Sequence, residues 1–143
     1  MRDGVMTEEA TSRPLPALDC DNKPFWTGGK DGKLLINQCR DCAYYVHPPA
    51  GFCPRCESRN VRPQQVSGRA KVYTFTINYK QWVPGLPERY TLALVALEEQ
   101  DDVLLPTNIV NCDPDDVVFD MPVRVLFEQQ EDVWVPLFEP SGA

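Results

Sequence analysis

Four cysteines form the most informative pattern in this sequence of 143 residues. They stand as two Cys-x-x-Cys pairs, Cys39 with Cys42 and Cys53 with Cys56, and ten residues separate the pairs. Each such turn can present two thiolates to one metal ion, and two turns together can surround Zn²⁺ with a tetrahedron of sulfur. The spacing therefore predicts one structural zinc ion. Because four sulfurs leave no position for water or substrate, the metal would organise the chain rather than perform hydrolysis.

A pair of disulfides or a thioredoxin-type redox motif is the alternative for these cysteines. Two pairs suit a metal better than they suit one redox turn, and no βαβ pattern surrounds either pair. His47, the only histidine, lies between the pairs, but four sulfurs already complete the coordination shell. Cys20 and Cys112 remain as free thiols. The use of thiols for metal favours a reducing compartment, which predicts a cytoplasmic protein.

The sequence offers no complete catalytic set. A Ser-His-Asp or Cys-His arrangement needs a histidine, and His47 belongs to the predicted zinc hairpin. Cys112 and the carboxylates of residues 113–116 are the remaining candidates for direct catalysis. Asp113 as a helix cap, followed by Pro114 in the first turn, explains that cluster as the start of a one-turn helix. We therefore predict no catalytic residue in this chain.

Charge is distributed unevenly along the sequence. The net charge of -7 argues against nucleic acid as a general partner. Between residues 30 and 80, however, nine cations stand against three acids, whereas the rest of the chain has five cations and eighteen acids. Phosphate-bearing ligands would be drawn to this cationic window, although solvated loops rich in Lys and Arg are an equally simple explanation. The nine cations are Lys30, Lys33, Arg40, Arg55, Arg59, Arg62, Arg69, Lys71 and Lys80.

The elements that must position the cysteines are short. Residues 1–20 are acidic and contain prolines, which predicts a flexible leader rather than a signal peptide or a membrane span. Residues 21–33 contain a helix-start signal at Pro24, and a short helix there would lay Phe25 and Trp26 on the rest of the protein. We expect a second unit, residues 21–65, to comprise this helix and the zinc ribbon.

Within that unit, a brief strand at residues 34–36 leads into the first cysteine pair. The segment between the pairs is rich in aromatic residues and proline, from Tyr44 to Phe52. This composition predicts a stiff hairpin whose rings cover the metal from water.

The third unit, residues 66–140, has the pattern of β-structure. Alternation from Val66 to Tyr79 predicts a long strand bent near Gly68, with Tyr73, Phe75, Ile77 and Tyr79 on one face. The nearly continuous apolar run at residues 90–97 predicts a strand buried on both sides. Further strands are predicted at residues 103–110, 123–128 and 133–138. The expected fold is therefore mainly β: a short N-terminal helix, a zinc ribbon and a five-stranded OB-fold barrel.

The order of these elements resembles the DUF35 family, in which a rubredoxin-like zinc ribbon precedes an OB-fold. The resemblance runs from Pro24 to Pro140. It is carried by Pro24-Phe25-Trp26, Gly32-Lys33-Leu34, Cys39-x-x-Cys42, Pro48-Pro49, Cys53-Pro54-x-Cys56, Ser67-Gly68-x-Ala70-x-Val72-Tyr73-Thr74-Phe75-Thr76, Leu94-Val95-x-Leu97-Glu98, Thr107-Asn108-Ile109-Val110, Cys112-Asp113-Pro114-Asp115-Asp116-Val117, Met121-Pro122-Val123-x-Val125-x-Phe127 and Pro136-Leu137-Phe138. Ala43 and Asn111 stand where the family pattern leads us to expect glycine.

The resemblance implies a partner protein. Members of the family associate with thiolase-superfamily enzymes that act on CoA thioesters, and they supply part of the assembly around the acyl-CoA. By this resemblance the chain is an accessory subunit without activity of its own, in a hetero-oligomer, expected to be a heterotetramer. The partner would be an aldolase, a thiolase or an acyltransferase, and the pathway the breakdown of a steroid side chain or an aromatic acyl-CoA.

The cationic window is compatible with that role, because it can meet the phosphates of CoA while nearby aromatic rings stack on adenine. The candidate CoA-binding residues are Arg69, Lys71, Tyr73, Lys80 and Trp82. A different class of function remains open. OB-folds with basic grooves and aromatic platforms also hold single-stranded nucleic acid. The net charge of -7 counts against that alternative.

Overall fold

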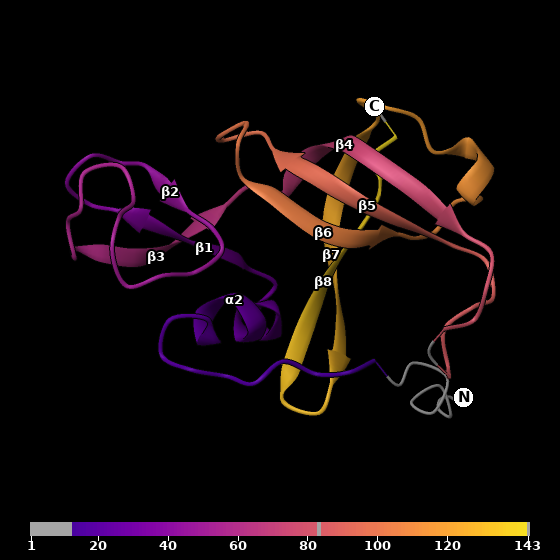
Figure 1. Ribbon diagram of the computed structural model, residues 1–143, viewed down its shortest axis with the longest axis horizontal. Helices are drawn as coiled ribbons and strands as arrows, with labels where there is room; N and C mark the ends of the chain where they lie inside the picture. Colours follow the sequence, from indigo (N-terminus) through magenta and orange to yellow (C-terminus); the bar gives the residue numbers. More distant parts are fainter. Residues whose placement is uncertain (1–12, 83, 143) are drawn as a thin grey trace.

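The computed structural model describes residues 13–82 and 84–142, whose strands form a three-stranded sheet followed by a closed barrel (Figure 1). The predicted fold class, a short helix, a zinc ribbon and a five-stranded barrel, is confirmed. The helices are α2 (Lys23–Thr27), η1 (Gly28–Asp31) and η2 (Pro114–Asp116). The strands are β1 (Leu34–Cys39), β2 (Tyr45–Val46), β3 (Val61–Val66), β4 (Arg69–Asn78), β5 (Tyr90–Leu97), β6 (Leu104–Ile109), β7 (Pro122–Gln130) and β8 (Val133–Pro140).

The N-terminal helix is short because its sequence both starts and stops it. Pro24 lies in the first turn of α2, and Gly32, with a φ of 72°, closes the following 3-10 turn in the left-handed region. Gly29 brings this turn against the β7–β8 hairpin. A Cβ atom at Gly29 would lie 2.5 Å from a ring carbon of Phe127, so only glycine permits this approach. The packing fixes the helix beside the barrel (Figure 1).

Strand β1 is the centre of the ribbon sheet and pairs antiparallel with both β2 and β3. It extends beyond the predicted residues 34–36 and ends at Cys39, the first predicted zinc ligand. The predicted continuous strand from Val66 to Tyr79 is wrong at its start. Val66 ends β3, and Gly68, with a φ of 84°, turns the chain into β4 of the other sheet.

The barrel closes in the order β4-β5-β6-β8-β7. Four of its neighbouring pairs are antiparallel, β4 with β5, β5 with β6, β7 with β8 and β4 with β7. The closing contact between β6 and β8 is parallel and joins Ile109 to Phe138. The Val110 N–H donates to the Phe138 carbonyl at 2.8 Å beside it. Closure between β6 and β8 therefore depends on a small patch around Phe138.

A β-bulge in β4 overturns part of the predicted alternation. The register with β5 shifts between Val72 and Thr74, so Tyr73 has no partner in the ladder. Tyr73 is 58% exposed, whereas Phe75 packs against the core, so the two rings do not share a face. The sequence does not reveal a bulge because the apolar and polar types continue to alternate through it.

The prediction that β5 is buried on both sides holds only at its C-terminal end, where Ala96 and Leu97 are both buried. Its inward residues, such as Ala93 and Val95, are buried, but Leu92 is 48% exposed on the outward side. The described residues thus leave an apolar strand partly uncovered.

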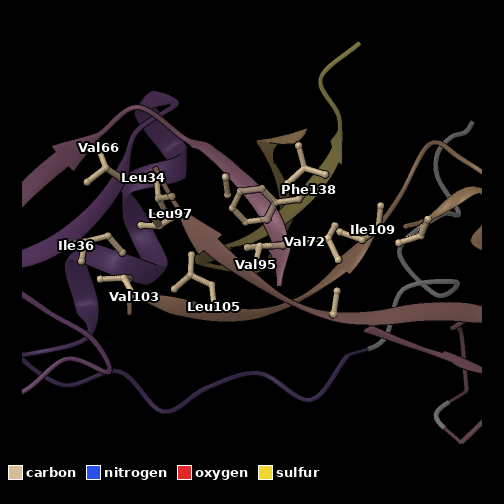
Figure 2. Packing of buried hydrophobic residues seen from close by; sticks show 14 residues of the cluster. Leu34, Ile36, Val66, Val72, Val95, Leu97, Val103, Leu105, Ile109 and Phe138 are labelled. Carbon is tan, nitrogen blue, oxygen red and sulfur yellow. The ribbon is translucent and has the colours of Figure 1, made fainter. Parts of the chain in front are cut away.

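The ribbon and the barrel share one apolar core (Figure 2). Leu34 and Ile36 of β1 pack in the same cluster as Leu97, Val103 and Leu105 of the barrel. Because burying apolar surface is the main stabilising contribution in folding, the two units stabilise each other.

Polar contacts hold the ribbon in a fixed orientation on the barrel. Gln100, in the β5–β6 turn, accepts a hydrogen bond from the Tyr45 N–H at 2.9 Å and donates one to the Tyr45 carbonyl at 3.0 Å. The Tyr44 hydroxyl donates to Asp102 at 2.9 Å. The zinc hairpin is therefore attached to the barrel through backbone as well as side chains.

Most of the predicted leader, residues 1–12, lies outside the described residues. Arg13 is held by the barrel, because its guanidinium donates to Glu128 and to Asn108, both at 2.8 Å. No helix within residues 13–82 and 84–142 combines the length and the apolar composition that a membrane crossing requires.

Candidate metal centre and ligand surfaces

The two cysteine pairs occupy turns of the same build. The Ala43 N–H donates to the Cys39 carbonyl, and the Glu57 N–H donates to the Cys53 carbonyl, both at 2.8 Å. Ala43 and Glu57 are left-handed, with φ of 69° and 68°. Glycine adopts this conformation without strain, which explains why the family pattern favours it at position 43. Asn111, the other expected glycine position, is left-handed as well, with a φ of 62°.

The four thiols fit a tetrahedral zinc ion. Their sulfur atoms all lie within 4.8 Å of one another. The Cys39 and Cys56 sulfurs are 3.6 Å apart, and those of Cys42 and Cys53 are 3.7 Å apart. A regular tetrahedron with Zn–S bonds of about 2.3 Å has edges of about 3.8 Å. The zinc ribbon with four cysteines is thus consistent with one structural zinc, and the assignment of Cys39, Cys42, Cys53 and Cys56 as its ligands stays a prediction.

The surroundings of the sulfurs are only partly those expected. Cys39, Cys53 and Val46 form a small buried cluster, while Cys42 is exposed. Phe52, predicted to help cover the metal, is instead exposed. Val46 of β2 and the partly buried Tyr44 therefore provide apolar cover, so the prediction of aromatic cover holds for Tyr44 and is wrong for Phe52.

His47 lies on the other side of this hairpin, against the N-terminal helix. Its ring centroid is 5.0 Å from that of Phe25, and its Nδ1 atom is buried without a hydrogen-bond partner. Burial lowers the pKa of His47 to about 4, so the ring is neutral at physiological pH. This environment suits a packed ring, and within the described residues the side chain makes no hydrogen bond that would orient it as a catalytic base.

The depressed pKa of His47 predicts a specific loss of stability in acid. Below its unfolded value of about 6.5, the unfolded chain takes up a proton that the folded chain refuses until about pH 4. Between pH 7 and pH 5.5 this group alone should cost ~1.3 kcal/mol of unfolding free energy. A His47→Phe variant should lack that contribution. Urea unfolding of both proteins at the two pH values measures it, and equal pH slopes would contradict the assignment.

A cavity of about 470 Å³ lies between the helix, the zinc hairpin and the barrel. Phe25 and Trp26 contribute from α2, Pro48 from the hairpin, Pro106 from β6 and Pro136 from β8. The sequence did not predict it, because its walls come from segments that only the tertiary structure brings together.

The five candidate CoA-binding residues fall into two groups at opposite ends of β4. Arg69, Lys71 and Tyr73 belong to its first half, while Lys80 and Trp82 lie in the loop after it. Strand rise places the two ends roughly 30 Å apart. Arg69 forms an ion pair with Glu98, with a shortest distance of 2.6 Å. The pKa of Arg69 is raised by this partner. The Lys71 ammonium lies 4.0 Å from Asp120, so both cations of the first group have a carboxylate of this chain nearby.

The second group pairs cations with aromatic rings. The Lys80 ammonium lies 4.4 Å from the centre of the Trp82 ring, and the Arg89 guanidinium lies 5.8 Å from that of Tyr79. The Trp82 indole N–H donates to Asn78 at 2.7 Å and steadies the ring. Arg89 lies outside the cationic window of residues 30–80, and the fold brings it beside Tyr79.

The acidic segment after β6 serves as a cap, as predicted. The Asp113 carboxylate accepts a hydrogen bond from the Asp115 N–H at 2.9 Å at the start of η2. The Asp113 and Asp115 carboxylates also form ion pairs with Arg89, at 3.3 and 2.7 Å respectively. Burial, aided by the neighbouring Asp116 and Asp113, raises the pKa of the Cys112 thiol. A raised pKa leaves little thiolate, so Cys112 is a poor nucleophile.

A four-thiol ribbon followed by a closed barrel defines a class of two-module proteins, with a rubredoxin-like zinc ribbon and an OB-fold. The sequence matches the family model of the ChsH2 rubredoxin-like zinc ribbon domain over residues 26–62. It matches that of the ChsH2 C-terminal OB-fold domain over residues 63–128. The chain therefore belongs to the DUF35 family of ChsH2-type proteins.

Relatives and one solved structure agree with this assignment. The chain is 32% identical to a probable enoyl-CoA hydratase alpha subunit of Thermomonospora curvata, over 90% of its own length and 40% of the relative's. It is 30% identical to the 3-oxo-4,17-pregnadiene-20-carboxyl-CoA hydratase alpha subunit of Mycobacterium tuberculosis, over 88% and 40% respectively. A DUF35 domain-containing scaffold protein of Methanocaldococcus jannaschii is 29% identical, over 73% of this chain and 74% of that protein.

The solved structure is a chain of the Ltp2-ChsH2(DUF35) aldolase. It superposes with a TM-score of 0.81 at 30% identity and covers 89% of this chain and 99% of that one. The chain spans about 40% of the length of the two hydratase alpha subunits. These similarities support an accessory-subunit role.

Proposed function

We propose that this chain is a non-catalytic accessory subunit of a thiolase-superfamily enzyme that acts on acyl-CoA thioesters. The similarity to a chain of the Ltp2-ChsH2(DUF35) aldolase carries this proposal. The chemistry of the described residues supports it, because the four-sulfur site leaves no open metal position and neither His47 nor Cys112 is activated. The carbon–carbon bond would be broken or formed in the partner's active site, by retro-aldol cleavage or by thiolysis.

The accessory subunit would stabilise the partner and help to form the entrance for CoA. Lys80 and Trp82 provide the chemistry for a phosphate-bearing adenine nucleotide, a cation beside an exposed ring. Arg89 also lies beside an exposed ring, that of Tyr79, but it is already paired with two carboxylates. Arg69, Lys71 and Tyr73 would contact a different part of the ligand or of the complex, since they lie at the other end of β4. We expect a heterotetramer in the cytoplasm, with a steroid side-chain or aromatic acyl-CoA as substrate.

The proposal is tested by assaying the chain with and without its partner. The chain alone should show no lyase or thiolase activity on acyl-CoA thioesters. The partner alone should be weakly active or unstable, and addition of this chain should restore turnover. A His47→Phe variant and a Cys112→Ala variant should restore it equally well, because neither group takes part in the chemistry. Lyase or thiolase turnover by the isolated chain would overturn the proposal.

Single-stranded nucleic acid is the second candidate, because the Lys80–Trp82 pair lies on a loop of an OB-fold. Ion pairs to Asp113 and Asp115 already neutralise Arg89, which weakens a phosphate-binding surface. Salt-dependent retention of a single-stranded oligonucleotide at physiological ionic strength would favour this function, since phosphate contacts release counterions.

A further inference from the structure

The outward side of β4, β5 and β6 carries two rows of side chains that contain no charge. Cross-strand register places Thr76, Leu92 and Asn108 in one row. It places Thr74, Leu94 and Pro106 in the next. We call these six residues the strand face. Three of them are apolar, and Thr74, Thr76, Leu92 and Pro106 are all exposed.

An apolar outward row is unusual for a sheet whose other side already packs in the core. In antiparallel sheets with one solvated side, outward positions are normally polar or charged. The outward residues in the middle of β5 are Leu92 and Leu94, and Leu92 keeps 48% of its surface exposed. The absence of charge together with exposed aliphatic surface is the composition found at the centre of protein interfaces.

The strand face continues into the cavity beside it. Leu92, Pro106 and Asn108 belong to the face and also line the cavity of about 470 Å³. The remaining walls include the ring of Trp26 and the side chain of Arg13, whose guanidinium donates to Asn108 at the edge of the face. A flat apolar surface next to an apolar hollow is suited to a partner that places one large side chain into the hollow, which is how interface hot spots are built.

The size of the strand face indicates its place within a larger interface. Three strands about 4.8 Å apart, each contributing two outward residues over roughly 14 Å of length, present roughly 200 Å². One partner in a standard interface buries about 800 Å². The strand face therefore accounts for part of the apolar centre of such an interface, beside the mouth of the cavity.

We propose that the strand face is the surface on which the partner enzyme docks, with an apolar side chain of that enzyme inserted into the cavity. This inference rests on the proposed function, which supplies an aldolase-like partner, and it adds the location of the contact. The similarity to a chain of a solved aldolase complex supports a protein occupant rather than a small ligand.

Two other occupants fit less well. A second copy of this chain, related by a two-fold axis on the same face, would set the flat strands against each other and leave the hollow unfilled. The chain's own residues 1–12 contain Val5 and Met6 but are otherwise mostly polar or charged, which gives them little apolar surface to cover the face.

The experiment compares three variants in binding to the partner enzyme. The thiolase-superfamily protein that co-purifies with the tagged chain is identified, produced separately and purified. Its affinity for the wild-type chain, Leu92→Glu, Thr76→Glu and Val118→Glu is then measured by biolayer interferometry. Val118, 57% exposed in the segment between η2 and β7, is the matched control for an added charge on exposed apolar surface. Thermal unfolding verifies that each variant folds. If Leu92→Glu does not fold, Thr76→Glu still tests the strand face.

We expect Leu92→Glu to weaken binding on the order of 30-fold, Thr76→Glu to weaken it several-fold, and Val118→Glu to leave it unchanged. Equal affinity for all four proteins would overturn the docking surface and leave the proposed function intact. A dimer of the isolated chain that Leu92→Glu dissociates would instead assign the face to a second copy. Faster hydrogen exchange in β5 after removal of residues 1–12 would assign it to the chain itself. Recovery of no thiolase-superfamily protein would count against the proposed function and this inference together.

Discussion

Replacement of Cys39 or Cys53 by serine is expected to abolish stoichiometric zinc binding and to unfold the zinc ribbon. Both residues are buried, and they belong to different turns. Each change removes one of the four sulfur atoms of the tetrahedron. Structural zinc contributes about 10–16 kcal/mol of apparent binding free energy in small zinc-finger peptides, and in such modules that energy is folding energy. A hydroxyl is a poor zinc ligand at neutral pH, so most of this contribution should be lost.

The consequences should extend into the barrel. Leu34 and Ile36 of the ribbon sheet lie in the same apolar cluster as Leu97 and Val103. Unfolding of the ribbon would expose that surface, and the barrel should lose stability even though none of its own residues is changed.

Zinc content by mass spectrometry and two-dimensional amide NMR measure the two effects separately. The variants should contain less than one tenth of an equivalent of zinc, and the dispersed signals of residues 39–62 should collapse. Cys20→Ser is the control, because Cys20 is exposed and lies outside the sulfur cluster. A Cys39→Ser protein with a full equivalent of zinc and a native ribbon spectrum would refute the ligand assignment.

Phe138→Ala is expected to destabilise the barrel by about 3–5 kcal/mol, the usual cost of truncating a fully buried aromatic side chain. Phe138 is the largest of the fully buried residues, and it packs among Val72, Val95 and Ile109. It also occupies the single parallel bridge between β6 and β8. The change therefore leaves a void at the point where the barrel closes (Figure 2).

Urea unfolding measures this effect as a lower midpoint at an unchanged slope. Phe119→Ala is the matched control, since Phe119 is 64% exposed and makes one ring contact, with Phe75. It should cost less than about 1 kcal/mol. Equal destabilisation by the two variants would show that closure at Phe138 does not determine the stability of the barrel.

Local sequence signals predicted the elements whose cause is local. Three signals act through neighbours in the chain: the cysteine spacing, the proline at position 24 and the cap at Asp113. The sulfur cluster, α2 and η2 appear where these signals place them. The barrel strands were predicted with errors of a few residues at their ends, because pairing with a neighbouring strand decides where a strand stops. Strand β3, Val61–Val66, was not predicted.

Positions that depend on long-range packing were predicted less well. The β4 bulge exposes Tyr73, and the separation of Arg69 from Lys80 divides a set of residues that the sequence had grouped by charge. The cavity and the pairing of Arg89 with Tyr79 likewise require segments far apart in the chain to meet. A count of charges along a sequence carries no information about which strand end each charge occupies.

The sequence by itself determined the zinc-ribbon chemistry, the order of the two modules and the continuous apolar character of residues 90–97. Only the tertiary structure decided that Leu92 faces outward, uncovered by the described residues, beside a hollow between the helix, the hairpin and the barrel. The physical reason is that hydrophobicity specifies that a strand needs cover on both sides, whereas the packing of distant elements decides which side this chain covers itself.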